Sequence, residues 1–342
     1  MYLKTYFFYS CLAVSVLVCQ PTQTQGQDLH FSQFAHASIL LSPTETGNYF
    51  GDWRFINNYR SQWGQIGKPL TTLATAFDRQ IYLYNQKLSI GGQFVHDESG
   101  NYLLVHQNFM LAAAYHQTVG YHTFRIGIQG GLVQKRLNSG GYSLPDQWDQ
   151  DLGEFNNRLP TNEHGFQRII YYPDFNFGIS YGRRIWKLDP EFTFSLFHIN
   201  RPSESFLFQH NPLSIRKVIY ITSPVELKNK WSLDPQFLYM WQNKSVDFVV
   251  GSYVNYDLAN NSFRAKYAFA GVSLRNSVTR NWDAFIFTGG LQFKHLRAAI
   301  SYDVTVSKLR LANSYSGAIE FALIYTGLSS VLGKRAIPCN RL

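Results

Sequence analysis

Four carboxylates lie close together in one stretch of the chain, and hard oxygen ligands at such short spacing suit a calcium ion. They are Asp146, Asp149, Asp151 and Glu154. Their spacing does not follow the EF-hand loop, and no glycine stands at the turn position of that loop. The sequence therefore favours a solvated acidic loop over a calcium site, and we expect no metal ligand here.

A second stretch with catalytic residue types is His96-Asp97-Glu98-Ser99. A serine hydrolase needs a serine, a histidine and an orienting polar group that converge in space. However, the chain has no G-x-S-x-G element, and its 10 histidines are dispersed. The glycine pairs, such as Gly91-Gly92, are not followed by the Lys-Ser/Thr of a phosphate loop. We therefore expect no catalytic residue and no cofactor, and we predict that the chain is not an enzyme.

The elements that must position these side chains are β-strands, as the stretch from Gly120 to Arg136 shows. Phe124 and Ile126 alternate with polar or very small residues, and this period of two places apolar groups on one face of a strand. Apolar residues facing lipid and polar residues facing a lumen are typical of an outer-membrane β-barrel. The polar lumen positions either line a conduit or form a salt-bridged plug; among them are Arg125, Gln129, Arg297 and Asp303.

Composition agrees with such a barrel. Aromatic residues make up 16% of the 342 residues, and charged residues make up 15%, below the roughly 25% of soluble domains. Beyond the N-terminus, no stretch is apolar enough for a transmembrane helix, which needs about 20 residues. The net charge of +9 is dispersed, so it favours acidic lipid head groups or an acidic partner over nucleic acid.

Residues 1–26 are expected to be a secretory signal peptide. Lys4 supplies the positive end, residues 6–19 supply a short apolar core, and cleavage is expected after Gly26. The alternative is a lipoprotein cysteine at Cys19, but bulky valines precede it. Cys339 is then the one cysteine of the mature chain, which leaves no internal disulfide and no zinc spacing.

We predict fourteen strands, which is an even number as single-chain bacterial barrels require. Their spans are 50–60, 70–79, 85–96, 105–118, 120–136, 173–183, 187–199, 214–224, 231–243, 245–257, 264–276, 281–292, 294–304 and 316–326. The strand at 264–276 alternates poorly near Lys266, which indicates a bulge. About fourteen strands enclose a lumen larger than side chains alone fill, so a domain, a partner segment or water is expected inside.

An ordered set of short motifs resembles the PorP/SprF family of type IX secretion system membrane proteins. The set consists of residues 27–34 (QDLHFSQF), 58–63 (NYRSQW), 75–78 (TAFD), 113–116 (AAYH), 126–131 (IGIQGG), 173–178 (PDFNFG) and the ending 334–342. The chain departs from the family pattern at Leu29, where a proline is usual, and at Ser42-Pro43-Thr44, where the family resembles N-P-A.

The resemblance implies an outer-membrane location in a bacterium of the Bacteroidetes type and a role in protein export. The resemblance implies one of two roles, either a part of the core machinery or a partner of one large adhesin, as in gliding motility. Other type IX secretion components in the outer membrane and periplasm, a secreted adhesin and membrane lipid are the implied partners. The resemblance implies no catalytic residue and no cofactor.

The expected organisation is a signal peptide (1–26), a periplasmic N-terminal segment (27–49), an all-β transmembrane antiparallel barrel of about 14 strands (50–326) and a periplasmic C-terminal tail (327–342). The long connection 137–172 is expected outside the cell, because long loops of such barrels face outward. The function expected is a scaffold or partner for export and surface anchoring of secreted proteins. The alternative is an outer-membrane channel or porin for small or hydrophobic solutes.

Overall fold

The computed structural model describes residues 28–328, except 66, 84–85, 100–103, 138–146, 157–158, 160–166, 208, 228–229, 259–264, 278–280 and 309. The signal peptide, the tail beyond residue 328, Cys339 and Asp146 therefore lie outside the described residues. Within these residues, none of the helices combines the length and the apolar character needed to cross a membrane.

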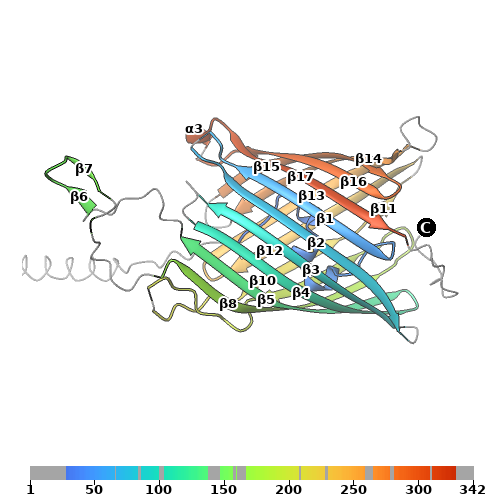
Figure 1. The fold of residues 1–342 in the computed structure, drawn as a ribbon. Coiled ribbons are helices and arrows are strands. Elements are labelled where there is room, and N and C mark those ends of the chain that lie inside the picture. The colour runs from blue at the N-terminus through green and yellow to red at the C-terminus, as the bar shows by residue number, and fades with distance from the viewer. Residues whose placement is uncertain are drawn as a thin grey trace, which may run out of the picture.

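Fourteen long strands form the body of the protein (Figure 1). They are β1 (Trp53–Gln62), β2 (Leu70–Leu83), β3 (Gln86–Ser99), β4 (Leu104–Val119), β5 (His122–Leu137), β8 (Ile169–Arg183), β9 (Glu191–Phe197), β10 (Arg216–Thr222), β12 (Trp231–Gln242), β13 (Ser245–Asp257), β14 (Ala265–Ser277), β15 (Asn281–Phe293), β16 (Leu296–Thr305) and β17 (Ser316–Gly327). Three two-residue strands are β6 (Trp148–Asp149), β7 (Glu154–Phe155) and β11 (Val225–Glu226).

The sheet closes on itself, because the first strand pairs with the last. β1 pairs with β2 on one side and with β17 on the other, in a register that places Arg60 opposite Glu320. Every pairing between neighbouring long strands is antiparallel, and β10 joins β9 to β12. The all-β barrel and its strand number are confirmed. The predicted bulge is also confirmed, since the register between β14 and β15 shifts between Ala265 and Tyr267.

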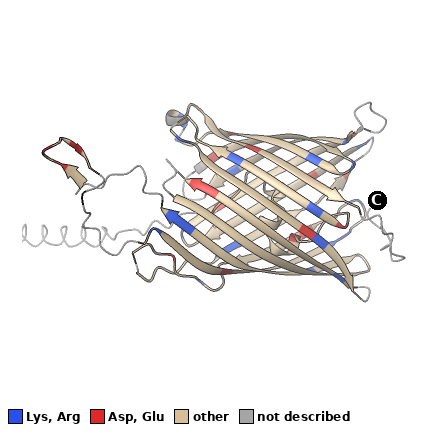
Figure 2. Cartoon of the chain, viewed as in Figure 1, with Lys and Arg blue, Asp and Glu red and all other residues tan. Residues whose placement is uncertain are grey.

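The two faces of the strands have the characters that their alternation predicts. Ile126 and Ile300 are 51% and 47% exposed on the outer face, whereas Arg125 is 4% exposed on the lumen face. Charged side chains are sparse along the strands and occur mostly toward their ends (Figure 2). Exposed aromatic residues, among them Tyr82, Tyr121, Tyr181, Trp186, Trp231 and Tyr325, lie near the strand ends, where membrane barrels carry aromatic girdles.

The two ends of the barrel differ in their connections. One end, which we call the long-loop end, carries the connections 63–69, 138–168, 198–215 and 306–315. The other, the short-turn end, carries turns such as 120–121 and 294–295. Such asymmetry is expected of outer-membrane barrels, and it supports the prediction that the long-loop end faces outward.

The N-terminal residues lie inside the barrel and not beyond it. Residues 28–49, which we call the lumen segment, contain η1 (Phe34–His36), α2 (Ser38–Leu41) and η2 (Pro43–Glu45). Most of residues 31–47 are buried, and Figure 1 shows the blue segment enclosed by strands. The sequence predicts a periplasmic place for residues 27–49. That placement needs correction, because the segment fills a lumen too wide for side chains alone.

The lumen segment runs along the barrel from end to end. It joins β1 at the short-turn end, where the Asp52 N–H donates to the carbonyl of Gly327. Its beginning, Asp28, contacts His198 and Arg216, which border the 198–215 connection at the long-loop end. The described chain therefore starts at the long-loop end of the barrel and crosses the lumen before its first strand.

Candidate functional site

Glycines on the lumen face create room for the 3-10 turn η2. A Cβ atom on Gly127 would lie 2.5 Å from the Pro43 carbonyl carbon and 2.6 Å from the Thr44 nitrogen. On Gly178 it would lie 2.9 Å from the Ser42 hydroxyl. Any larger residue at Gly127 would therefore meet backbone atoms of the lumen segment. These glycines allow the close backbone approach that the sequence analysis expected of strand glycines.

An ion pair fixes the lumen segment near the short-turn end. Arg54 and Asp78, both fully buried, lie 2.8 Å apart on β1 and β2. Arg54 also donates to the Glu45 carbonyl at 3.0 Å, and Asp78 accepts the Gly47 N–H at 2.7 Å. Each charge thus pairs with the other and also with the segment's backbone. Charge-assisted bonds of this kind are shorter and stronger than neutral ones.

A second cation holds η2 from the opposite side. The Arg125 guanidinium pairs with Glu191 of β9, lies 3.5 Å from Glu45 and donates to the Ser180 hydroxyl at 2.9 Å. Glu45 therefore joins the lumen segment to a barrel wall that lies across the lumen from β1. This contact makes the segment a bridge between two walls.

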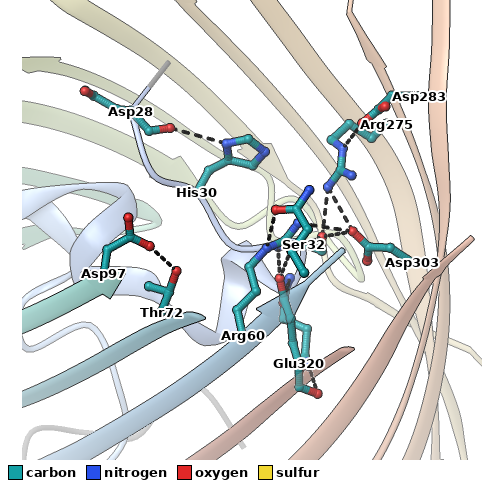
Figure 3. Close-up of polar contacts among 12 residues, drawn as sticks. Asp28, His30, Ser32, Arg60, Thr72, Asp97, Arg275, Asp283, Asp303 and Glu320 are labelled. Carbon is teal, nitrogen blue, oxygen red and sulfur yellow. Dashed lines mark hydrogen bonds and ion pairs between the residues drawn. The ribbon is translucent and has the colours of Figure 1, made fainter. Parts of the chain in front are cut away.

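The densest polar cluster lies toward the long-loop end, where β1 meets β17 (Figure 3). The Glu320 carboxylate accepts the backbone N–H groups of Ser32 at 2.7 Å and Gln33 at 2.8 Å, and it pairs with Arg60. Glu320 is 1% exposed. We call this group, with Asp303 and Arg275, the closing cluster.

The hydroxyl of Ser32 lies at the centre of the closing cluster. It donates to Asp303 at 2.6 Å and accepts from Arg60 at 2.7 Å and from Arg275 at 2.9 Å. Arg275 pairs in turn with Asp303 at 3.1 Å and with Asp283 at 2.7 Å. Buried charges are tolerated when they are paired and hydrogen-bonded, and this cluster meets that condition.

The rest of the lumen segment packs on apolar side chains. Phe34 and Leu41 belong to one buried cluster with side chains of β9, β10, β12, β13 and β15, and Phe34 meets Tyr220 edge-on with ring centroids 5.8 Å apart. The His36 ring stacks on Phe269 at 5.6 Å and meets Tyr253 edge-on at 5.7 Å. Burial of this apolar surface is a non-directional contribution that complements the ion pairs.

The start of the lumen segment is held by a charged group just past the end of β9. Asp28 lies 2.6 Å from His198 and 3.3 Å from Arg216, and His198 lies 3.0 Å from Asp174. Burial alone would lower the pKa of His198, but the neighbouring carboxylates, Asp28 first, raise it to about 9. His198 is therefore a cation at neutral pH, and it neutralises carboxylates from both the segment and the wall.

The predicted lumen residues all face inward, and they occupy different parts of the site. Arg125 and Asp303 contact the lumen segment itself or its partners, as described above. Gln129 accepts a hydrogen bond from Asn176 at 2.8 Å, and Arg297 stacks over Phe269 at 4.3 Å. Of the two predicted alternatives, a conduit or a salt-bridged plug, the second describes Arg125 and Asp303, whose ion pairs help to hold the segment inside the barrel.

Sequence reasoning missed several residues of this site. Arg54, Arg60, Asp78, Arg275 and Glu320 all lie on the lumen faces of their strands and bind the segment or its anchors. Their signal was present, because each is a charge on the polar face of an alternating strand. What the pattern did not contain was the partner that each charge meets.

The catalytic and metal candidates behave as structural residues. Asp149 accepts the N–H groups of Asp151 and Leu152 at 3.0 and 3.2 Å, so it caps the turn between β6 and β7. The described residues contain no group of three or more histidine, cysteine, aspartate or glutamate side chains that could hold a metal ion. Ser99 donates to Asp97 at 3.3 Å, and His96 pairs with Glu98 at 2.9 Å, which is not a nucleophile–base arrangement.

The decisive comparison is with a protein family. The family model described as type IX secretion system membrane protein PorP/SprF matches residues 23–325, almost the whole chain. The chain belongs to the PorP/SprF family. Membership and the fourteen-strand barrel together make this PorP/SprF protein an outer-membrane protein, and the resemblance seen in its sequence motifs is confirmed.

Solved outer-membrane barrels are similar to this PorP/SprF protein only distantly. The Ralstonia pickettii toluene transporter TbuX is 10% identical, with a TM-score of 0.49 over 84% of this chain and 92% of that one. The CymD monoaromatic hydrocarbon channel is 9% identical, with a TM-score of 0.49 over 89% and 95% of the two chains. A comparison with curated protein sequences found no match.

Proposed function

We propose that this PorP/SprF protein is a scaffold of the type IX secretion and gliding system. It helps to export secreted proteins or adhesins and to anchor them at the cell surface. The barrel anchors it in the outer membrane. The long-loop end presents connections on which cargo is held. The C-terminal tail (residues 327–342) offers a docking site for periplasmic components.

The observation that carries the proposal is the occupied lumen. The lumen segment is tied to the wall by the Arg54–Asp78 pair, by Arg125 and by the closing cluster, and its backbone N–H groups donate to buried carboxylates. Breaking one partner of a buried pair costs about 3–5 kcal/mol, so an open lumen would require several such losses. This supports a scaffold over a passive pore.

The test is the secreted and surface proteome of a clean deletion strain, measured by mass spectrometry with the wild-type gene returned as control. Loss of one adhesin is expected if the protein serves a dedicated cargo, and broad loss is expected if it is core machinery. An unchanged proteome would contradict a role in secretion. Removal of residues 328–342 should also reduce export without unfolding the barrel.

The channel alternative is tested separately with purified protein. Liposome swelling and single-channel conductance should both be near zero for the wild type, because the lumen segment fills the barrel. A variant that lacks residues 28–48 and still folds should conduct. Conductance by the wild-type protein equal to that of this variant would favour the channel function.

A further inference from the structure

The wall of the barrel has a step between β8 and β9. β8 pairs with β5 over its whole length, from Ile169 to Arg183. β9 has only seven residues, and it pairs with β8 only from Phe177 to Gly182. On this side, the first half of β8 therefore has no strand beside it among the described residues. The step lies at the long-loop end (Figure 1).

Part of this exposed edge is capped by the connection that follows β9. The Phe175 N–H donates to the Asn200 side chain, the Phe175 carbonyl accepts the Ile199 N–H, and Asn200 donates to the Pro173 carbonyl. Further along, the Gln167 N–H donates to the Phe206 carbonyl. The backbone groups of residues 167, 173 and 175 thus all point to the same side of β8.

Between these caps lies an uncapped stretch. Backbone groups alternate in direction along a strand, so those of Ile169 and Tyr171 point to the same side as those of residues 167 and 173. No strand of the described chain pairs with Ile169 or Tyr171 on this side. We call residues 169–171 the open edge. Unpaired strand edges are templates for pairing with another chain, and proteins normally cover them.

A cavity lies against the open edge. It has a volume of about 570 Å³ and separates the edge from the 198–215 connection. Its lining is mainly polar and comes from Gln167, Ile169, Tyr171, Ser203, Ser205 and His210. The cavity gives an extended segment room to lie beside β8. The hydroxyl and amide groups of the lining residues can form hydrogen bonds with polar side chains of that segment.

Three exposed arginines, which we call the rim, are neighbours in sequence or in strand register of residues that line this cavity. Arg136 pairs in register with Ile169, Arg168 precedes the open edge, and Arg201 lies in the connection on the other side; all three are exposed. The nearby carboxylate of Glu204 is already paired with Lys135 at 2.5 Å. The excess positive charge therefore favours an acidic segment and disfavours a basic one.

We propose that the open edge of β8 binds an extended acidic polypeptide segment, which adds as a strand in the cavity between β8 and the 198–215 connection. Main-chain hydrogen bonds to Ile169 and Tyr171 provide affinity, and the three arginines provide selectivity. The inference rests on the proposed function only in naming an exported protein as the source of the segment. The binding itself is a property of this chain.

The test uses full-length protein in detergent and fluorescein-labelled ten-residue peptides, with binding followed by anisotropy. One peptide alternates glutamate with threonine and valine, and a second has lysine in place of glutamate. We expect the acidic peptide to bind at least tenfold more tightly than the basic one. Affinity should fall with salt, because the rim is exposed and its field is screened.

Two variants separate the edge from the charges. Arg168→Glu should weaken binding of the acidic peptide at least tenfold, whereas Lys244→Glu, at an exposed turn of the same end, should change it less than twofold. Tyr171→Pro removes the N–H that faces the cavity and leaves the ladder to β5, which already tolerates Pro173. It should abolish measurable binding.

Chemical modification of the peptide gives the same test without a protein variant. An acidic peptide with N-methyl groups at every residue has no main-chain donor on either of its edges, so it should bind at least tenfold more weakly. Equal binding of the acidic and basic peptides, no binding of the acidic one, or full binding of its N-methylated form would each overturn the proposal. A normal deletion-strain proteome with intact peptide binding would instead contradict only the proposed function.

Discussion

Two walls of the lumen hold the same segment by different means. The polar wall consists of the lumen-facing charges of the neighbouring strands β1, β2, β16 and β17, namely Arg54, Arg60, Asp78, Asp303 and Glu320. The apolar wall consists of lumen-facing side chains of β10, β12, β13 and β15, namely Val218, Tyr220, Leu238, Met240, Val249 and Ile286.

The difference between the walls shows how a segment with little regular structure gains one position. Apolar burial is roughly proportional to area and has no direction, so the apolar wall would accept Phe34 and Leu41 in several registers. The polar wall accepts only one register, because Asp78 and Glu320 accept particular backbone N–H groups and Asp303 accepts the Ser32 hydroxyl. The apolar wall therefore contributes binding energy without a fixed register, and the polar wall fixes the position of the segment.

The largest effect is expected from breaking the polar wall at Glu320. Glu320→Ala removes the nearer carboxylate of Arg60, which keeps only Asp303 at 3.5 Å, and it leaves two N–H groups of the lumen segment without an acceptor. Loss of one member of a buried pair costs about 3–5 kcal/mol. Urea unfolding in detergent micelles should show this loss.

A matched control for Glu320 is the exposed Glu226 on β11. Glu226→Ala should leave the unfolding midpoint within experimental error, since exposed charges contribute little. If Glu320→Ala were equally silent, the closing cluster would not position the segment, and the distinction between the walls would fail.

The apolar wall is tested at Leu41, which is 7% exposed. Leu41→Ala should reduce the free energy of unfolding by about 2–4 kcal/mol, because it removes buried methyl groups and leaves a cavity. The same change at Leu111, which is 60% exposed on the outer face, should have a much smaller effect. Cysteine labelling of the segment should show that Leu41→Ala loosens it without shifting its register.

The contrast between inner and outer faces is sharpened by placing a charge at Ile126. Ile126→Arg should make membrane insertion less favourable by about 2–4 kcal/mol, because the side chain lies on the lipid face. Tyr121→Arg, in a turn at the short-turn end, should be tolerated. Heat-modifiability of the outer-membrane fraction measures both, and normal levels of the Ile126 variant would mean that the faces are reversed.

A smaller effect is expected where β5 approaches the segment's backbone. Gly127→Ala places a Cβ atom against Pro43 and Thr44, and overpacking of this kind costs about 1–3 kcal/mol. Gly182→Ala is the control, since its Cβ would meet atoms only at ordinary contact distances of 3.7 Å or more. Equal stability of the two variants would show that η2 moves away from the added Cβ atom without loss of stability.

The smallest expected effect comes from pH at the start of the segment. The pKa of His198 is raised from 6.5 to about 9, so its contribution is complete below pH 6.5 and is lost as the pH rises through about 9. The pKa of Asp28 is lowered, although burial opposes this, because Arg216 and His198 lie beside it, so its contribution is complete above its ordinary pKa of 3.8 and is lost as the pH falls below that value.

The measurement is the difference in melting temperature between the wild type and His198→Gln as a function of pH. We expect the difference to correspond to about 1 kcal/mol at pH 6 and to vanish near pH 10. A difference that stays constant from pH 6 to pH 10 would show that His198 is not charged in the folded protein.

The barrel was largely predictable because its strands repeat with a period of two. In β5, the alternation from Phe124 to Leu132 fixes both the element and its two faces, and the same holds for β17 around Phe321. Even the bulge near Lys266 was visible, as a break in that period. Each of these signals is local in the sequence.

The position of the lumen segment was not predictable for the opposite reason. Residues 28–49 have neither strand nor long-helix periodicity, and their partners lie up to 288 residues away in the chain, as for Ser32 and Glu320. One signal did exist. Gly91, Gly127 and Gly178 stand at lumen positions, and a backbone must fill the space that three missing side chains leave.

The closing cluster also couples the seam of the barrel to the position of the segment. Arg60 and Glu320 face each other across β1 and β17, the strands that join the beginning of the barrel to its end. Ser32 contacts both strands of this seam, because its N–H donates to Glu320 and its hydroxyl accepts from Arg60. Opening the seam would separate the two side chains that meet at Ser32. The lumen segment therefore acts as a latch across the joint of the barrel.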